Sequence, residues 1–198
     1  MTQALDRLLK EVRALHQRHG ALAEFCPWPD DIAAQRVEPF HIPAADLMTS
    51  EAGFGQTPYQ GLCDALTDVS DQMMWRETYK GSNIDPDFME RFACYEIIGW
   101  DAPFASKSMR SFVVYQPPRL HYPWHHHPAE EIYVVLAGQA EFHMQDETPR
   151  TLSAGDSAFH PSGRPHALTS HDHPVLAYVA WRNHFDIAPV WTYPENPQ

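Results

Sequence analysis

Residues 123–138 read PWHHHPAEEIYVVLAG, and the spacing of the polar residues in this stretch is the strongest structural signal in the chain. Four polar side chains occupy odd positions: His125, His127, Glu131 and Tyr133. Because side chains of an extended strand alternate between its two faces, residues an even number of positions apart share a face. The spacing therefore predicts that these four side chains converge, whereas His126 and Glu130 point the other way.

Histidine is concentrated around this stretch, since nine of the 13 histidines lie between His121 and His173. Neutral imidazoles together with a carboxylate form a common ligand shell for first-row divalent metals. We therefore expect His125, His127 and Glu131 to bind one divalent transition metal ion, for which Fe, Mn, Zn, Ni and Co are all compatible. The simpler alternative is a β-structure that keeps this spacing without a metal.

The chain after about Met109 consists of short runs rich in Val, Ile, Tyr and Phe, separated by Pro and Gly, which is typical of antiparallel strands. The predicted strands are Arg110–Gln116, Glu131–Leu136, Gln139–Gln145, Ser157–His160 and Val175–Arg182. Gly138 predicts a hairpin turn, and Ala154-Gly155-Asp156 predicts another. Short strands at close spacing indicate an all-β core, either a barrel or a jelly roll of two sheets.

The first half of the chain is predicted to be mainly helical, because its apolar residues recur at helical spacing. The predicted helices cover Ala4–His19, Gly61–Tyr79 and a third stretch from Pro86 to Tyr95. Residues 25–60 are rich in proline and predict a long ordered loop. The predicted division is a helical and loop extension (1–108), a barrel core (109–186) and a C-terminal tail that packs outside or frays (187–198).

The charge balance argues against two classes of partner. The chain has 26 acidic and 14 basic residues, a net charge of -12, which repels nucleic acid and anionic membrane surfaces. No stretch approaches the ~20 consecutive apolar residues that span a bilayer, and the amphipathic N-terminus lacks an apolar signal core, so we expect a cytoplasmic protein. The expected partner is a small-molecule substrate. A homodimer is compatible with the sequence, which does not determine the oligomeric state.

The two histidine-containing segments resemble the two motifs of the cupin superfamily. The first is His125-x-His127-x(3)-Glu131-x(6)-Gly138, and the second is Gly155-x(5)-Pro161-x-Gly163-x(2)-His166. The chain departs from the pattern at Arg119, where a Gly often begins the first motif, and at Ser170, where an Asn often closes the second. The resemblance implies a cupin jelly-roll barrel in which His166 is the fourth metal ligand.

Residues 121–133, HYPWHHHPAEEIY, are similar to the bacterial cupin lyases that cleave dimethylsulfoniopropionate, the DddQ-like group. The similarity is sharpest over residues 110–182, and those enzymes also place helices before the barrel. Its most specific feature is Tyr133, two residues after the predicted ligand Glu131. The resemblance implies a carbon–sulfur lyase that releases dimethyl sulfide and acrylate by β-elimination.

Such an elimination needs a base for the α-proton, stabilisation of the developing enolate and a place for a cationic leaving group. A divalent metal that binds the substrate carboxylate would supply a Lewis acid. Tyr133 is the first candidate base, because a nearby cation favours the ionised phenol. Tyr122, three residues before His125, is the second candidate. The plainer interpretation of both tyrosines is that they only pack in their strands.

A sulfonium group also needs an aromatic enclosure, since a ring face attracts a cation by roughly 0.5–2 kcal/mol. The aromatic residues available for it are Trp124, Tyr122, Trp181 and Phe159. The family resemblance favours the barrel interior for Trp181, although each ring also fits an ordinary core position. Two other functions stay open: a second kind of metal-dependent cupin enzyme, such as an Fe(II) dioxygenase or an isomerase, and a cupin that binds a small acid without catalysis.

Overall fold

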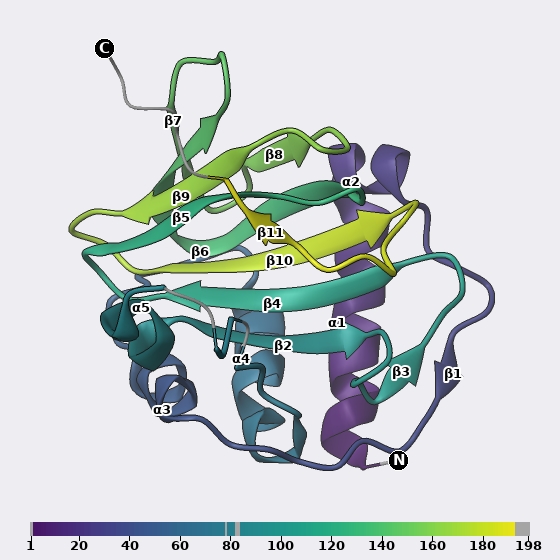
Figure 1. The fold of residues 1–198 in the computed structure, drawn as a ribbon. Coiled ribbons are helices and arrows are strands. Elements are labelled where there is room, and N and C mark those ends of the chain that lie inside the picture. The colour runs from purple at the N-terminus through teal and green to yellow at the C-terminus, as the bar shows by residue number, and fades with distance from the viewer. Residues whose placement is uncertain (1, 78, 82–83, 193–198) are drawn as a thin grey trace.

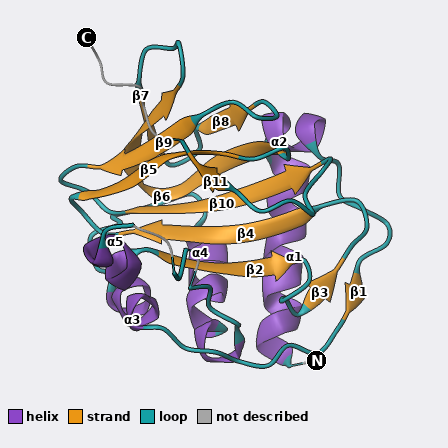
Figure 2. Cartoon of the chain, viewed as in Figure 1, coloured by secondary structure: helices purple, strands orange, loops and turns teal. Residues whose placement is uncertain are grey.

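The computed structural model describes residues 2–77, 79–81 and 84–192. A β-structure forms the core, and helices from the N-terminal half cover one of its faces (Figure 1). Figure 2 shows the two longest of these helices, α1 and α4, behind the strands. The predicted architecture, an all-β jelly-roll core with an N-terminal helical extension, is confirmed.

The strands pair mainly antiparallel. They are β1 (Ala33–Ala34), β2 (Ala93–Ile98), β3 (Phe104–Ala105), β4 (Arg110–Gln116), β5 (Leu120–His126), β6 (Glu130–Met144), β7 (Arg150–Ser153), β8 (Ser157–His160), β9 (His166–Ser170), β10 (Val175–Arg182) and β11 (Val190–Trp191). Neighbouring strands follow the order β1-β3-β2-β4-β10-β6-β9-β5-β11, and β7 and β8 also pair with β6. The predicted strands β4, β8 and β10 are confirmed with their bounds.

β6 is one strand of 15 residues where two were predicted, so the predicted hairpin at Gly138 is wrong. Gly138 has a φ of 69°, and a Cβ at this position would lie 1.8 Å from the carbonyl oxygen of Pro174. Glycine alone tolerates both conditions. The strand pairs with β8 and β10 before this residue and with β7 and β9 after it. Gly138 therefore lets one continuous strand pair with β8 and β10 at its start and with β7 and β9 at its end. The second predicted hairpin, at 154–156, is a turn between β7 and β8, which pair with β6 and not with each other.

The helix predicted over 4–19 is confirmed as α1, whereas the other two predicted helices are shorter than predicted. The helices of the first half are α1 (Gln3–Arg18), α2 (Gly20–Phe25), α3 (Pro43–Ser50), α4 (Gln60–Asp68), the 3-10 helix η1 (Ser70–Gln72) and α5 (Pro86–Arg91). The predicted helix over 61–79 ends at Asp68, and position 78 lies outside the described residues. The predicted loop over 25–60 contains α3. In the part of the chain that the structure describes, no helix is long and apolar enough to cross a membrane.

The third predicted helix gives way to a strand. α5 ends at Arg91, and β2 follows with all six of its residues buried. A strand buried on both faces lacks the apolar–polar alternation that identifies a strand in a sequence. β2 pairs with β4, so the sheet includes residues that the sequence assigned to the helical extension.

Two hydrophobic cores lie on opposite faces of the shared strands β6 and β10. Along β10 and residues 130–136 of β6, even-numbered residues such as Ile132 and Leu176 pack against the helices. Odd-numbered residues, such as Val135 and Val179, face the barrel interior. The strand alternation thus separates a helix-facing core from a barrel-facing core, and the predicted site belongs to the second.

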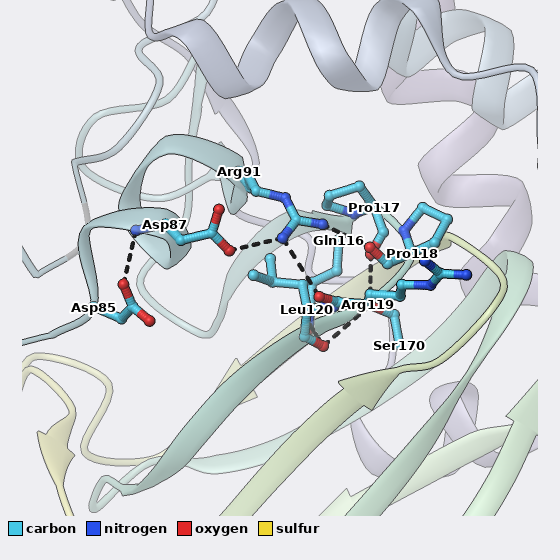
Figure 3. A network of polar contacts seen from close by, with 9 residues as sticks. All are labelled: Asp85, Asp87, Arg91, Gln116, Pro117, Pro118, Arg119, Leu120 and Ser170. Carbon is cyan, nitrogen blue, oxygen red and sulfur yellow. Dashed lines mark hydrogen bonds and ion pairs between the residues drawn. The ribbon is translucent and has the colours of Figure 1, made fainter.

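Arg119 and Ser170, the two departures from the cupin motifs, lie in one polar network (Figure 3). Arg119 has a φ of 61°, the left-handed conformation that glycine adopts without strain. The Ser170 hydroxyl accepts the Leu120 backbone N–H at 3.1 Å. Arg91 of α5 donates to the Pro118 carbonyl at 2.6 Å. The network ties α5 to the turn that leads into β5, the strand that carries His125.

Candidate metal centre and active site

Three predicted ligands, His125, His127 and His166, come together in the barrel interior. His125 on β5 lies opposite His166 on β9, the neighbouring antiparallel strand. His127 follows β5 directly, and all three side chains are buried. Glu131, the fourth predicted ligand, enters from β6 and is also buried. The structure therefore brings together the four residues that the sequence singled out.

Each of the three histidines uses its Nδ1 atom for a local contact with a backbone carbonyl. The contacts are His125 Nδ1 to Pro123 at 2.8 Å, His127 Nδ1 to Ala129 at 2.9 Å and His166 Nδ1 to Arg164 at 2.9 Å. Because a carbonyl oxygen only accepts hydrogen bonds, Nδ1 carries the ring proton in each case. In the neutral form of each ring, Nε2 consequently has a free lone pair, which is the arrangement of a metal-binding imidazole.

These lone pairs face a carboxylate instead of a donor. His166 Nε2 lies 3.1 Å and His127 Nε2 lies 3.6 Å from Glu131 Oε2. Among the residues that the structure describes, neither nitrogen has a hydrogen-bond partner, although both are buried. Lone pairs at this separation repel each other unless a cation lies between them, and an unpaired buried polar atom is costly. The donor set therefore fits a divalent cation.

The ligand atoms form two overlapping groups that share His166. One group is His125, His127 and His166, and the other is Glu131, His160 and His166. Either group could hold a metal ion. The assignment of His125, His127, Glu131 and His166 to one ion stays a prediction.

The protonation states suit metal binding. Burial, with a contribution from His166, holds the pKa of His125 well below its usual 6.5, so the ring is neutral. Burial alone would raise the pKa of Glu131, but the charge of a protonated His127 and the hydrogen bond from His160 hold it well below its usual range. Burial alone would lower the pKa of His127, yet the Glu131 charge raises it. Without a metal ion, the ionised Glu131 therefore favours a proton on His127, and a divalent cation would replace that proton.

Tyr133 and Tyr122, the two candidate bases, both line a pocket with three of the candidate metal ligands, His125, His127 and Glu131. The Tyr122 ring stacks on the His125 ring at 4.1 Å, and its hydroxyl lies 2.5 Å from the Tyr79 hydroxyl. A β-bulge between Tyr122 and His125 allows an even-numbered and an odd-numbered residue to face the same side. Tyr133 lies opposite Val179 of β10, and its ring is 5.5 Å from the His160 ring.

With only the protein's own groups present, neither phenol ionises readily. Burial, followed by the negative charge of Glu131, raises the pKa of Tyr133 well above its usual 10. Burial, followed by the neighbouring Tyr79, raises the pKa of Tyr122 in the same direction. A cation in the site would oppose both shifts.

The pocket extends from the candidate metal ligands across an aromatic and aliphatic wall and has a volume of about 420 Å³ including its open mouth. The remaining lining residues are Arg76, Phe92, Cys94, Phe112, Val114, Val179, Trp181 and Pro189. Trp181, predicted as a wall for the sulfonium, lies in this pocket and donates its indole N–H to Glu131 Oε1 at 2.6 Å.

The other two predicted aromatic contacts do not reach this pocket. Phe159 is 43% exposed and lies against Phe25 of α2, because its strand neighbours Ala158 and His160 face the interior. Trp124 is half-buried, and its ring lies 6.1 Å from His143, which is outside the pocket lining. We correct the prediction for both residues, since the strand alternation turns them away from the pocket.

Several residues that surround the site were not predicted from the sequence. His160, Arg76, Tyr79 and Trp191 are the main ones. His160 lies two residues after Ala158 on β8, so the alternation within this predicted strand was an available signal. The other three come from segments that are distant in the sequence, and no local pattern marks them.

Comparison with known proteins identifies relatives over nearly the whole chain. The model of the dimethylsulfoniopropionate (DMSP) lyase family matches residues 14–177. The dimethylsulfoniopropionate lyase DddQ of Ruegeria pomeroyi is 50% identical over 98% of this chain and 98% of its own.

Solved structures agree over the same length. The crystal structure of the DMSP lyase DddQ from Ruegeria pomeroyi superposes with a TM-score of 0.96 at 49% identity, covering 100% of both chains. A chain from the crystal structures of the DMSP lyases RdDddP and RnDddQII superposes with a TM-score of 0.91 at 32% identity, covering 96% of this chain and 98% of that one. The likeness therefore includes the N-terminal helices as well as the barrel.

Proposed function

The chain belongs to the dimethylsulfoniopropionate lyase family, and from this premise we propose that it is a metal-dependent lyase that cleaves dimethylsulfoniopropionate. The reaction is a β-elimination: the α-proton leaves to a base, the carbon–sulfur bond breaks, and its electron pair leaves with the sulfur. One substrate molecule gives dimethyl sulfide, acrylate and one proton. The observation that carries this proposal is the pair of unpartnered Nε2 atoms that face Glu131 beside a tyrosine-lined pocket.

The residues proposed to hold the metal are His125, His127, Glu131 and His166. A divalent ion bound there would act as a Lewis acid toward the substrate carboxylate and would favour the ionised form of a nearby phenol. The local hydrogen bonds to Nδ1 support this proposal, because they fix each ring in the tautomer that a ligand requires.

Tyr133 is the proposed base. Its phenol lines the pocket two residues from Glu131, and its strand partner Val179 contributes to the apolar wall that limits access of water. Tyr122 is the second candidate, and its hydrogen bond with Tyr79 suggests that it orients the substrate. Of the two phenols, only Tyr122 has its hydroxyl oxygen engaged by a second tyrosine, which supports Tyr133 as the proton acceptor.

The pocket wall suits a sulfonium group. The ring centroids of Trp181 and Phe112 lie 5.1 Å apart, with an angle of 62° between the ring planes, and the two rings form one side of the pocket. Arg76 and Arg110 already lie over the Phe112 ring, and Arg110 also lies 5.9 Å from the Trp181 ring centroid. The two rings thus belong to a wall that attracts cations by roughly 0.5–2 kcal/mol and offers neutral dimethyl sulfide packing contacts only. Release of the neutral product is thereby favoured after the elimination.

The direct test uses purified protein and dimethylsulfoniopropionate, with dimethyl sulfide measured in the headspace and acrylate measured in solution. We expect both products in equal amounts, loss of both after chelation and dialysis, and recovery when a divalent metal is added back. A protein that contains metal but forms neither product would contradict the lyase proposal. Consumption of oxygen with other small acids would instead favour a dioxygenase.

A further inference from the structure

His160 is the direct cross-strand partner of Glu131. β8 pairs antiparallel with β6, and the register places His160 opposite Glu131 and Ala158 opposite Tyr133. The His160 side chain is buried and faces the barrel interior. Its contact with the site is therefore fixed by strand pairing and does not depend on a flexible loop.

His160 is oriented differently from the three histidines proposed as ligands. Its Nδ1 atom lies 2.7 Å from Glu131 Oε2, whereas the Nδ1 atoms of the other three contact backbone carbonyls. Because an ionised carboxylate only accepts hydrogen bonds, the Nδ1 atom of His160 carries the proton. The ring also stacks on the His166 ring at 4.0 Å and 18°, which restricts its rotation.

Both oxygens of Glu131 are held by donors from different strands. Trp181 of β10 donates to Oε1 at 2.6 Å, and His160 of β8 donates to Oε2 at 2.7 Å. Oε2 is also the oxygen that faces the Nε2 atoms of His127 and His166. A carboxylate bound at both ends in this way cannot rotate away from the imidazoles without breaking a buried, charge-assisted hydrogen bond.

We propose that His160 is a positioning residue that holds Glu131 Oε2 toward the Nε2 atoms of His127 and His166 and thereby sets the metal affinity of the site, without binding the ion itself. This inference rests on the metal site of the proposed function. Hydrogen bonds to metal-binding carboxylates typically change metal affinity by about 10–100-fold when they are removed.

The test compares two substitutions at this position. His160→Leu removes the donor but fills a similar volume, whereas His160→Asn retains an N–H close to the place of the Nδ1 proton. The affinity for Zn²⁺ is measured by competition with a chromogenic chelator, and the absorption of the Co²⁺-loaded protein reports the ligand set. We expect His160→Leu to bind Zn²⁺ about 10–100-fold more weakly, and His160→Asn to stay within about threefold of the wild type with an unchanged Co²⁺ spectrum.

A matched control is His171→Leu, which changes a histidine with a 60% exposed side chain and should leave the Zn²⁺ affinity unchanged. Equal losses in the Leu and Asn variants, with an altered Co²⁺ spectrum in both, would show that His160 is a direct ligand and would overturn the inference. Unchanged affinity in both variants would overturn it as well. The wild-type titration separately tests the metal site of the proposed function, so the two failures are distinguishable.

If the wild type bound neither ion, thermal unfolding of the metal-free variants would still test the contact. A lower melting temperature of His160→Leu, together with a wild-type melting temperature of His160→Asn, would support the role of His160 in holding Glu131. Equal melting temperatures in all three proteins would contradict it.

Discussion

Buried histidines from other elements lie on both sides of β6 and β10, and the two sides differ in how these histidines are paired. On the helix-facing side, His16 of α1 uses both ring nitrogens, with Nδ1 at 2.9 Å from the Cys26 carbonyl and Nε2 at 2.8 Å from the Tyr178 hydroxyl. On the barrel-facing side, His127 and His166 use only Nδ1 and leave Nε2 without a partner. A fully paired histidine connects secondary-structure elements, whereas a half-paired one beside a carboxylate is ready for a metal ion.

We expect the largest effect when one of the histidines with an unpaired Nε2 atom is replaced. His166→Ala removes a nitrogen that both donor groups share, so we expect the protein to lose its metal and its activity to fall to background while the fold persists. His16→Ala should retain its full metal content despite a lower stability. Elemental analysis after exhaustive dialysis measures the metal content of both variants. Full metal occupancy in His166→Ala would exclude this residue as a ligand.

The second-largest effect distinguishes Tyr133, on the barrel-facing side, from Tyr178, on the helix-facing side. Tyr133→Phe keeps the ring but removes the proposed base, so kcat should fall by about 10²–10⁴-fold with the metal retained. Tyr178→Phe removes the hydroxyl that contacts His16, which should cost about 1 kcal/mol of stability and leave kcat unchanged. Steady-state kinetics and urea denaturation of both variants distinguish the roles. A Tyr133→Phe enzyme with near-native turnover would transfer the role of base to Tyr122 or another group.

The alternation of side chains made the core of the site predictable from the sequence. His125, His127 and Glu131 lie within seven residues. Their spacing alone therefore predicted that they share a face, and no knowledge of the strand pairing was needed. His166 needed the second motif, because only the register of β5 with β9 brings it next to His125. Strand register depends on contacts between distant segments and is not encoded locally.

The wrong predictions have the same physical origin. Gly138 has a positive φ, which suits both a hairpin turn and a bend within one strand, and only the close approach of Pro174 distinguishes them. Phe159 looked available because it is aromatic and near the second motif, yet the pairing of β8 with β6 assigns the interior to His160. β2 is buried on both faces and so resembled the end of a helix.

A smaller effect concerns the pH dependence of stability. Burial lowers the pKa of His16 from 6.5 to about 4 in the folded protein. As the pH falls below 6.5, the unfolded chain binds a proton that the folded chain cannot, so the free energy of unfolding decreases until the pH reaches about 4. His16 alone should therefore make the protein about 2 kcal/mol less stable at pH 5 than at pH 7.

Burial also lowers the pKa of His125 and His160, so these groups likewise make the protein less stable as the pH falls. The contribution of His16 is therefore isolated by comparing the wild type with a variant. His16→Gln removes the titrating ring, and the difference between pH 7 and pH 5 in its urea-unfolding free energy should be smaller than that of the wild type by about 2 kcal/mol. His41→Gln is the matched control, because its side chain is 57% exposed. Identical pH dependence of the wild type and His16→Gln would show that His16 does not stay neutral in the folded state.

The smallest effect tests the alternation on β8. Phe159 is 43% exposed and contacts Phe25, whereas its neighbour His160 is buried against Glu131. Phe159→Ala removes apolar contacts on the outer surface, so we expect a stability loss of no more than about 1 kcal/mol and a kcat/KM within about twofold of the wild type. Phe112→Ala, which shortens a ring in the pocket wall beside Trp181, should in contrast raise the KM for a sulfonium substrate. Measuring kcat/KM for both variants with dimethylsulfoniopropionate compares the two faces directly. A strong loss in Phe159→Ala with an intact fold would mean that the outer face of β8 takes part in substrate binding, and the separation of the two faces would then fail at this strand.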